Sequence, residues 1–175
     1  MKRQLLILTT VIAVLGLFTV VACKKDTTTP GNNNNNNNNN PTTVCSGGNL
    51  CFKLDGTQET YTAEWRKIPA VGSNPERYRI YWQNTDGSRN IEMDVYATAT
   101  GTYNIKSSSP YAANDAAFQY YMGTKNVVGQ SGTVEITGID NTNNTISGKF
   151  TVTASDGSAT YQVTEGNFEN VPLKP

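Results

Sequence analysis

Residues 77–97 read RYRIYWQNTDGSRNIEMDVYA, and they contain the clearest structural signal in this chain. Apolar and polar side chains alternate on both sides of Asp86-Gly87, a dipeptide that commonly joins two antiparallel strands. If Asp86-Gly87 is the centre of a type I′ turn, every apolar pair falls on one side of the hairpin. The stretch therefore predicts a β-hairpin with one buried face. The expected apolar pairs are Trp82 with Ile91, Ile80 with Met93, and Tyr78 with Val95.

The opposite side of this hairpin is a candidate ligand face. The same register places Arg79 opposite Asp94 and Tyr81 opposite Glu92. Aromatic rings beside charged hydrogen-bonding groups are typical of a surface that binds sugars or peptides. The alternative is a set of ordinary strand tyrosines and ion pairs, or a face that is buried under a second sheet. The candidate residues are Tyr81, Tyr96, Arg77, Arg79, Glu92 and Asp94.

The C-terminal half repeats the alternating pattern. Val134 and Ile136 precede a polar turn at 140–144, and apolar positions alternate again over 146–152. A second reversal at Asp156-Gly157 is expected to place Val152 opposite Tyr161 and Phe150 opposite Val163. This half therefore predicts two further hairpins.

The whole domain is predicted to be all-β, because no segment after residue 51 has an apolar stripe with the 3.6-residue period of a helix. Shorter strands are expected at 51–54, 60–66, 101–105 and 118–122, which brings the total to about nine. An antiparallel β-sandwich of two sheets is the expected architecture, and a flattened β-barrel is the alternative.

Four segments of this domain resemble an uncharacterised family of Bacteroidota-type β-domain lipoproteins. Their order and spacing carry the resemblance, which covers most of the chain after Cys51. It implies an exported all-β domain and transfers no catalytic or binding residue. The segments are GTY at 101–103, SGTVEIT at 131–137, ISGKF at 146–150 and GNFENVPL at 166–173.

Residues 1–22 have the pattern of a lipoprotein signal peptide. Lys2 and Arg3 precede an apolar run that ends with Val20-Val21-Ala22-Cys23. That tetrapeptide resembles the lipobox of bacterial lipoproteins, which implies cleavage before Cys23 and acylation of its thiol and amino group. An uncleaved anchor helix is the alternative, because the apolar run has nearly the length of a membrane span.

Residues 23–44 are expected to form a disordered tether between the lipidated cysteine and a single β-domain at 45–175. Nine consecutive asparagines at 32–40 and two flanking prolines leave almost nothing to bury. Lys24 stands where an aspartate would retain many lipoproteins in the inner membrane. We therefore expect an outer-membrane protein, lipid-anchored on the periplasmic face or at the cell surface, and a monomer.

The remaining cysteines, Cys45 and Cys51, form an even pair in an exported protein, so a disulfide between them is expected. A metal site is the rival interpretation. Two thiols make a poor site in a chain without histidine, and the polar turn at 140–144 lacks the later ligands of a calcium loop. We expect neither a metal nor a cofactor.

Composition limits the function further. The absence of histidine removes the usual general base and the Ser/His and Cys/His nucleophile pairs. The 14 basic residues balance 14 acidic ones without clustering, so nucleic acid is not an expected partner. We expect a non-catalytic binding or structural domain, with a glycan or an envelope protein as partner. The alternative is a glycan-processing enzyme that uses carboxylates such as Glu92 and Asp94.

Overall fold

A computed structural model describes residues 45–174, which fold around one hydrophobic core. The predicted signal peptide, Cys23 and the predicted tether lie outside the described residues. Ten strands and no helix occur in the part that is described: β1 (Leu50–Leu54), β2 (Thr57–Tyr61), β3 (Glu64–Ile68), β4 (Arg77–Gln83), β5 (Arg89–Val95), β6 (Gly101–Ile105), β7 (Asp115–Met122), β8 (Lys125–Asp140), β9 (Thr145–Ser155) and β10 (Thr160–Pro172).

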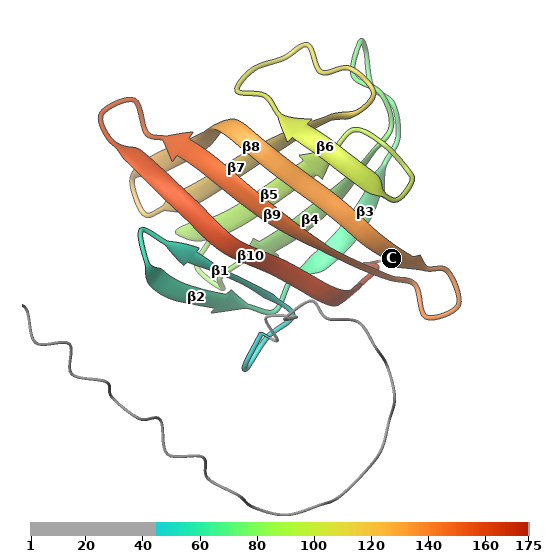
Figure 1. The fold of residues 1–175 in the computed structure, drawn as a ribbon, viewed down its shortest axis with the longest axis horizontal. Helices are drawn as coiled ribbons and strands as arrows, with labels where there is room; N and C mark the ends of the chain where they lie inside the picture. Colours follow the sequence, from blue (N-terminus) through green and yellow to red (C-terminus); the bar gives the residue numbers. More distant parts are fainter. Residues whose placement is uncertain (1–44, 175) are drawn as a thin grey trace, which may run out of the picture. The chain divides into compact units, whose positions relative to one another are not determined.

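These strands form one curled sheet in the order β2-β1-β10-β9-β8-β6-β7-β5-β4-β3. The curl makes a half-barrel in which β8, β9 and β10 cross over β4, β5 and β7 (Figure 1). The predicted all-β class is confirmed. One continuous sheet supplies both layers in place of the two sheets that we expected, and the pairing of β6 with β7 is parallel.

The two edges of the curled sheet meet at one corner. Strands β2 and β3 lie at opposite ends of the strand order, yet only Thr62 and Ala63 separate them in the chain. The single strand predicted at 60–66 is therefore wrong, because the chain crosses from one edge to the other at this point. A bridge between Trp65 and Leu173 ties β3 to the end of β10.

The first hairpin has the predicted register, in which Tyr78 pairs with Val95, Ile80 with Met93 and Trp82 with Ile91. Its turn differs from the prediction. Gly87 has a positive φ of 73°, but Asp86 does not, and a type I′ turn needs a positive φ at both. Instead, Asn84 and Arg89 close a four-residue loop that has the same centre. The pairing of β4 with β5 keeps the predicted register because the centre of the turn is unchanged.

The last hairpin is shifted by two residues from the predicted register. Val152 pairs with Val163, and Tyr161 pairs with Ala154. The side-chain carboxylate of Asp156 accepts hydrogen bonds from the backbone N–H groups of Ser158 and Ala159, so the loop holds four residues. A shift of two residues keeps each side chain on its expected face.

Aromatic side chains fill the space between the two layers. The ring centroids of Phe118 on β7 and Phe150 on β9 are 6.2 Å apart, and Phe52 on β1 meets Tyr120 on β7 at 5.9 Å. All four are at most 2 % exposed. Burial of each such side chain contributes about 1.5–3 kcal/mol, so these contacts hold the curl of the sheet.

Buried tyrosines also join the edge strand β2 to the facing layer. The hydroxyl of Tyr61 lies 2.7 Å from that of Tyr120, and its ring packs 4.2 Å from Trp82. Arg89 donates a hydrogen bond to Tyr120. Burial, together with Glu59 and Tyr120, raises the pKa of Tyr61, so its hydroxyl stays protonated and available as a donor.

The predicted disulfide between Cys45 and Cys51 is present in the structure, with the two Cα atoms 5.5 Å apart. Cys51 lies in β1, which pairs with both β2 and β10. The bond therefore attaches the start of the described chain directly to the sheet.

Gly148 offers a test of how tightly β8, β9 and β10 pack. A Cβ at this position would lie 2.1 Å from the backbone oxygen of Glu135 and 2.3 Å from the ring of Phe168. Gly148→Ala should therefore lower the free energy of unfolding by about 1–3 kcal/mol in urea denaturation. Gly138→Ala is the matched control, because no atom lies within 4 Å of its added Cβ. Equal stability of the two variants would contradict this packing.

Candidate functional site

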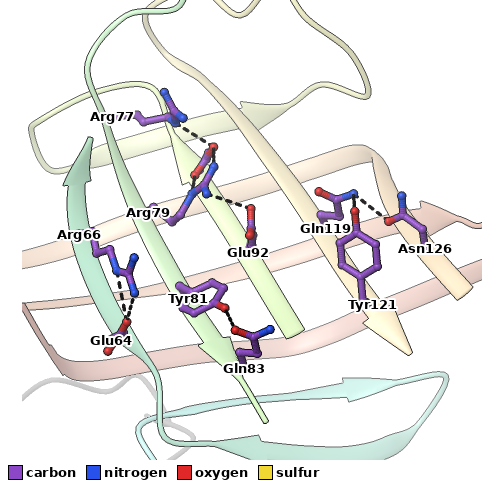
Figure 2. Close-up of polar contacts among 11 residues, drawn as sticks. Glu64, Arg66, Arg77, Arg79, Tyr81, Gln83, Glu92, Gln119, Tyr121 and Asn126 are labelled. Atoms are coloured by element: carbon purple, nitrogen blue, oxygen red, sulfur yellow. Dashed lines mark hydrogen bonds and ion pairs between the residues drawn. The ribbon is translucent and has the colours of Figure 1, made fainter. Parts of the chain in front are cut away.

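Strands β3, β4, β5 and β7, with the start of β8, present polar side chains on the surface that faces away from the core (Figure 2). We call this surface the polar face. Its side chains alternate along each strand with the apolar residues of the core. The polar face consists of Glu64, Arg66, Arg77, Arg79, Tyr81, Gln83, Glu92, Asp94, Gln119, Tyr121 and Asn126.

The predicted cluster of two arginines and two carboxylates is assembled on β4 and β5. Arg79 donates to Asp94 from Nε at 2.6 Å and from Nη2 at 2.8 Å, and Arg77 Nε donates to Asp94 at 2.9 Å. Arg79 also lies 3.2 Å from Glu92. The hydrogen bonds to Asp94 raise the pKa of Arg79, which keeps this guanidinium charged. Two positive and two negative groups therefore neutralise one another.

This pairing limits what the carboxylates can do chemically. Asp94 has a side chain that is only 10 % exposed, and both of its oxygens accept hydrogen bonds from arginine. Glu92 is more accessible, but it is also paired with Arg79. A general base needs an oxygen that is free to accept a proton from a substrate. The cluster has the geometry of an ion-pair network that stabilises the sheet.

Tyr96 does not belong to the exposed surface, contrary to our prediction. It is 4 % exposed, and its ring stacks on that of Tyr111 with centroids 4.4 Å apart and an interplanar angle of 13°. Burial, followed by the charge of Asp94, raises the pKa of Tyr96 to about 12. The segment after β6 brings Tyr111 over this ring, a contact that the hairpin sequence does not reveal.

Tyr81 remains partly exposed on the polar face. Its hydroxyl donates a hydrogen bond to Gln83, and the guanidinium carbon of Arg66 lies 5.3 Å from its ring centroid. A shallow hollow of about 290 Å³ is lined by Tyr81, Arg66 and Glu64, among others. Another hollow, of about 220 Å³, lies beside Tyr96 and the arginine cluster. The two predicted tyrosines thus line different hollows.

The structure adds residues that sequence reasoning missed. Gln119 on β7 donates hydrogen bonds to the hydroxyl of Tyr121 at 2.7 Å and to Asn126 at 2.8 Å (Figure 2). Glu92 pairs with Gln119 across the β5–β7 ladder, so these side chains share the polar face. Alternation within the strand predicted at 118–122 could have placed Gln119 and Tyr121 on one side. Nothing in the sequence indicated that β7 pairs with β5.

Residues 45–174 lack two kinds of feature. This part of the chain contains no group of three or more His, Cys, Asp or Glu side chains that could hold a metal ion. It also contains no helix of the length and apolarity needed to cross a membrane.

Residues 54–172 match a family model described as "Domain of unknown function (DUF6252)". No curated protein and no solved structure matches the chain.

The arginine cluster yields a prediction about stability. Asp94→Asn should lower the free energy of unfolding by about 1–3 kcal/mol, because Arg77 and Arg79 lose the charge that compensates them in a mostly buried setting. Glu92→Gln is the control and should cost less than about 1 kcal/mol, since both members of that pair are 27 % exposed. Chemical denaturation of the two variants measures the difference. A larger loss for Glu92→Gln would contradict the assignment.

Proposed function

Because this chain belongs to the family described as Domain of unknown function (DUF6252), which assigns no activity, we propose its function from its own residues. It is a lipid-anchored protein of the bacterial outer membrane, of the Bacteroidota type. Its β-domain binds a ligand on the polar face and catalyses no reaction.

The anchor is supported by the sequence before the domain and by the cysteine pairing within it. The chain has three cysteines, and Cys45 is bonded to Cys51. Cys23 is therefore the one cysteine left outside that bond, and it directly follows Val20-Val21-Ala22. Two or three acyl chains on one cysteine hold a protein stably on a membrane.

The binding role rests mainly on one observation. On the polar face, the charged side chains have partners within the face, but two tyrosine side chains are partly open to solvent. The charged groups of the face are paired with one another, whereas Tyr81 and Tyr121 are only half-buried. Tyrosine is a common anchor of binding surfaces because its rigid ring loses little entropy on contact. These rings lie on paired strands, so the scaffold beneath them is rigid.

The polar face lacks the free acid and base groups that catalysis commonly uses. The chain has no histidine, and the carboxylates of Glu92 and Asp94 are paired with arginines. A glycan-processing enzyme is the alternative function. Hydrolysis of a polysaccharide that Glu92→Gln abolishes would establish that alternative and contradict ours.

Labelling with a fatty-acid probe tests the anchor. The wild-type chain should incorporate the probe and fractionate with the outer membrane. Cys23→Ser should abolish labelling, because its hydroxyl cannot replace the thiol that is acylated. Cys45→Ser is the matched control and should leave labelling intact. Labelling that persists in Cys23→Ser would contradict the assignment.

Photo-crosslinking in cells tests the binding role. A diazirine amino acid in place of Val128, which pairs with Gln119, would sit beside the polar face. It should crosslink to an envelope component. The same amino acid in place of Thr151, which is exposed on β9, serves as the control and should not. Equal crosslinking at both positions, or none at either, would contradict a ligand on the polar face.

A further inference from the structure

We propose that the polar face binds a neutral polysaccharide, with one sugar stacked on Tyr81 and another on Tyr121. This inference rests on the proposed binding role and specifies the class of ligand. It follows from the way the two rings are held, from the polar atoms beside them, and from the charge balance around them.

The rings of Tyr81 and Tyr121 are each held by a hydrogen bond between the tyrosine hydroxyl and a glutamine side-chain amide. The hydroxyl of Tyr81 bonds to the amide of Gln83, and the hydroxyl of Tyr121 bonds to the amide of Gln119. In each case the amide lies two residues away on the same strand, so the ring lies along its strand and does not stand upright. Figure 2 shows the Tyr121 ring lying along β7 toward Gln119. A ring surface that faces solvent can stack on the C–H groups of a sugar. In Tyr81 the guanidinium of Arg66, 5.3 Å from the ring centroid, already covers one surface of the ring, so a sugar would stack on the other.

The amides beside the rings retain atoms for sugar hydroxyls. Gln119 uses its Nε2 atom for both Tyr121 and Asn126, which leaves its Oε1 atom as an acceptor. Gln83 accepts from Tyr81 through Oε1, which leaves its Nε2 atom as a donor. Among the residues that the structure describes, neither remaining atom has a hydrogen-bond partner. Donors and acceptors beside a flat ring match the hydroxyls around the edge of a sugar.

The two rings lie at the same level on the sheet and point in opposite directions along their strands. Tyr81 points along β4 toward Gln83, whose row continues through Asn90 to Tyr121. Tyr121 points back along β7 toward Gln119, which shares a row with Tyr81. Strand β5 lies between β4 and β7, so the rings are separated by two strand spacings, or about 10 Å. This separation is comparable with the span of a disaccharide, and it favours an extended glycan over a single sugar.

The charges of the polar face favour a neutral glycan. It contains three arginines and three carboxylates, and every one of them is paired within the face. The neighbouring cation Lys174, which lines the hollow beside Tyr81, is also paired, with Glu64 at 3.0 Å. An acidic polysaccharide or a phosphate would need cations that are free of such partners. The pairs are Arg66 with Glu64, Arg77 with Asp94, and Arg79 with both Asp94 and Glu92.

A peptide ligand fits this surface less well. An extended peptide usually binds by adding a strand to a free sheet edge. The tyrosines lie on β4 and β7, which are interior strands with neighbours on both sides. Their backbone groups are already used in the sheet, so recognition must occur through side chains alone.

Affinity electrophoresis of the full chain in non-ionic detergent tests the proposal. The gels contain either a neutral polysaccharide (mixed-linkage β-glucan, galactomannan, arabinoxylan or amylopectin) or an acidic one (polygalacturonate or alginate). At least one neutral polymer should retard the protein, and neither acidic polymer should do so. Tyr81→Ala and Tyr121→Ala should each weaken binding about tenfold, the usual scale for loss of an anchoring aromatic ring.

Two further variants make the test specific. Tyr161→Ala removes a tyrosine that packs against the core and contacts Lys125, away from the polar face, and it should bind as the wild type does. Tyr121→Phe keeps the ring but loses the bond to Gln119, so it should weaken binding less than Tyr121→Ala. Thermal melting confirms that each variant is folded.

The possible failures are distinguishable. Absence of retardation by every neutral polymer, retardation by acidic polymers alone, or equal losses in Tyr161→Ala and Tyr121→Ala would overturn the glycan proposal. Crosslinking at position 128 together with any of these results would overturn only the ligand class and leave the binding role. Absence of crosslinking at position 128 would overturn the binding role itself.

Discussion

The contact between the two layers of one curled sheet is the interaction on which the rest of this structure depends. Phe52, Phe118, Tyr120 and Phe150 meet across the interior and are almost completely buried. Because both layers belong to the same sheet, burying these rings also brings β2 and β3, the two ends of the strand order, to one corner. The sheet is curved by its core, and the surface that faces away from this core becomes the polar face.

The position of the polar face follows from that curvature and from strand alternation. Residues that do not enter the core on β4, β5 and β7 must face outward, where they contact one another, solvent and side chains from β3 and β8. The charged side chains satisfy one another in pairs. The hydroxyls of Tyr81 and Tyr121 are hydrogen-bonded to neighbouring amides. The proposed ligand would therefore meet aromatic surface rather than unpaired charge on this face.

In the proposed function, two of the three cysteines form the disulfide and the third carries the lipid anchor. Cys45 and Cys51 attach the start of the domain to β1, while Cys23 is left for acylation. A ligand held on the polar face would then be linked to the membrane through the sheet, the disulfide and the segment before it. The neutral balance of charge on the face suits a surface whose specificity comes from stacking and hydrogen bonding.

The sequence by itself determined the all-β class, the register of the hairpin at 77–97, the pairing of Cys45 with Cys51 and the assembly of Arg77, Arg79, Glu92 and Asp94. These features are local, because alternation and a turn centre relate residues that are close in the chain. Only the tertiary structure decided that one sheet forms both layers, that Tyr111 covers Tyr96, and that Tyr121 joins Tyr81 on one face. Those outcomes depend on which distant strands pair, and strand alternation carries no information about the partner.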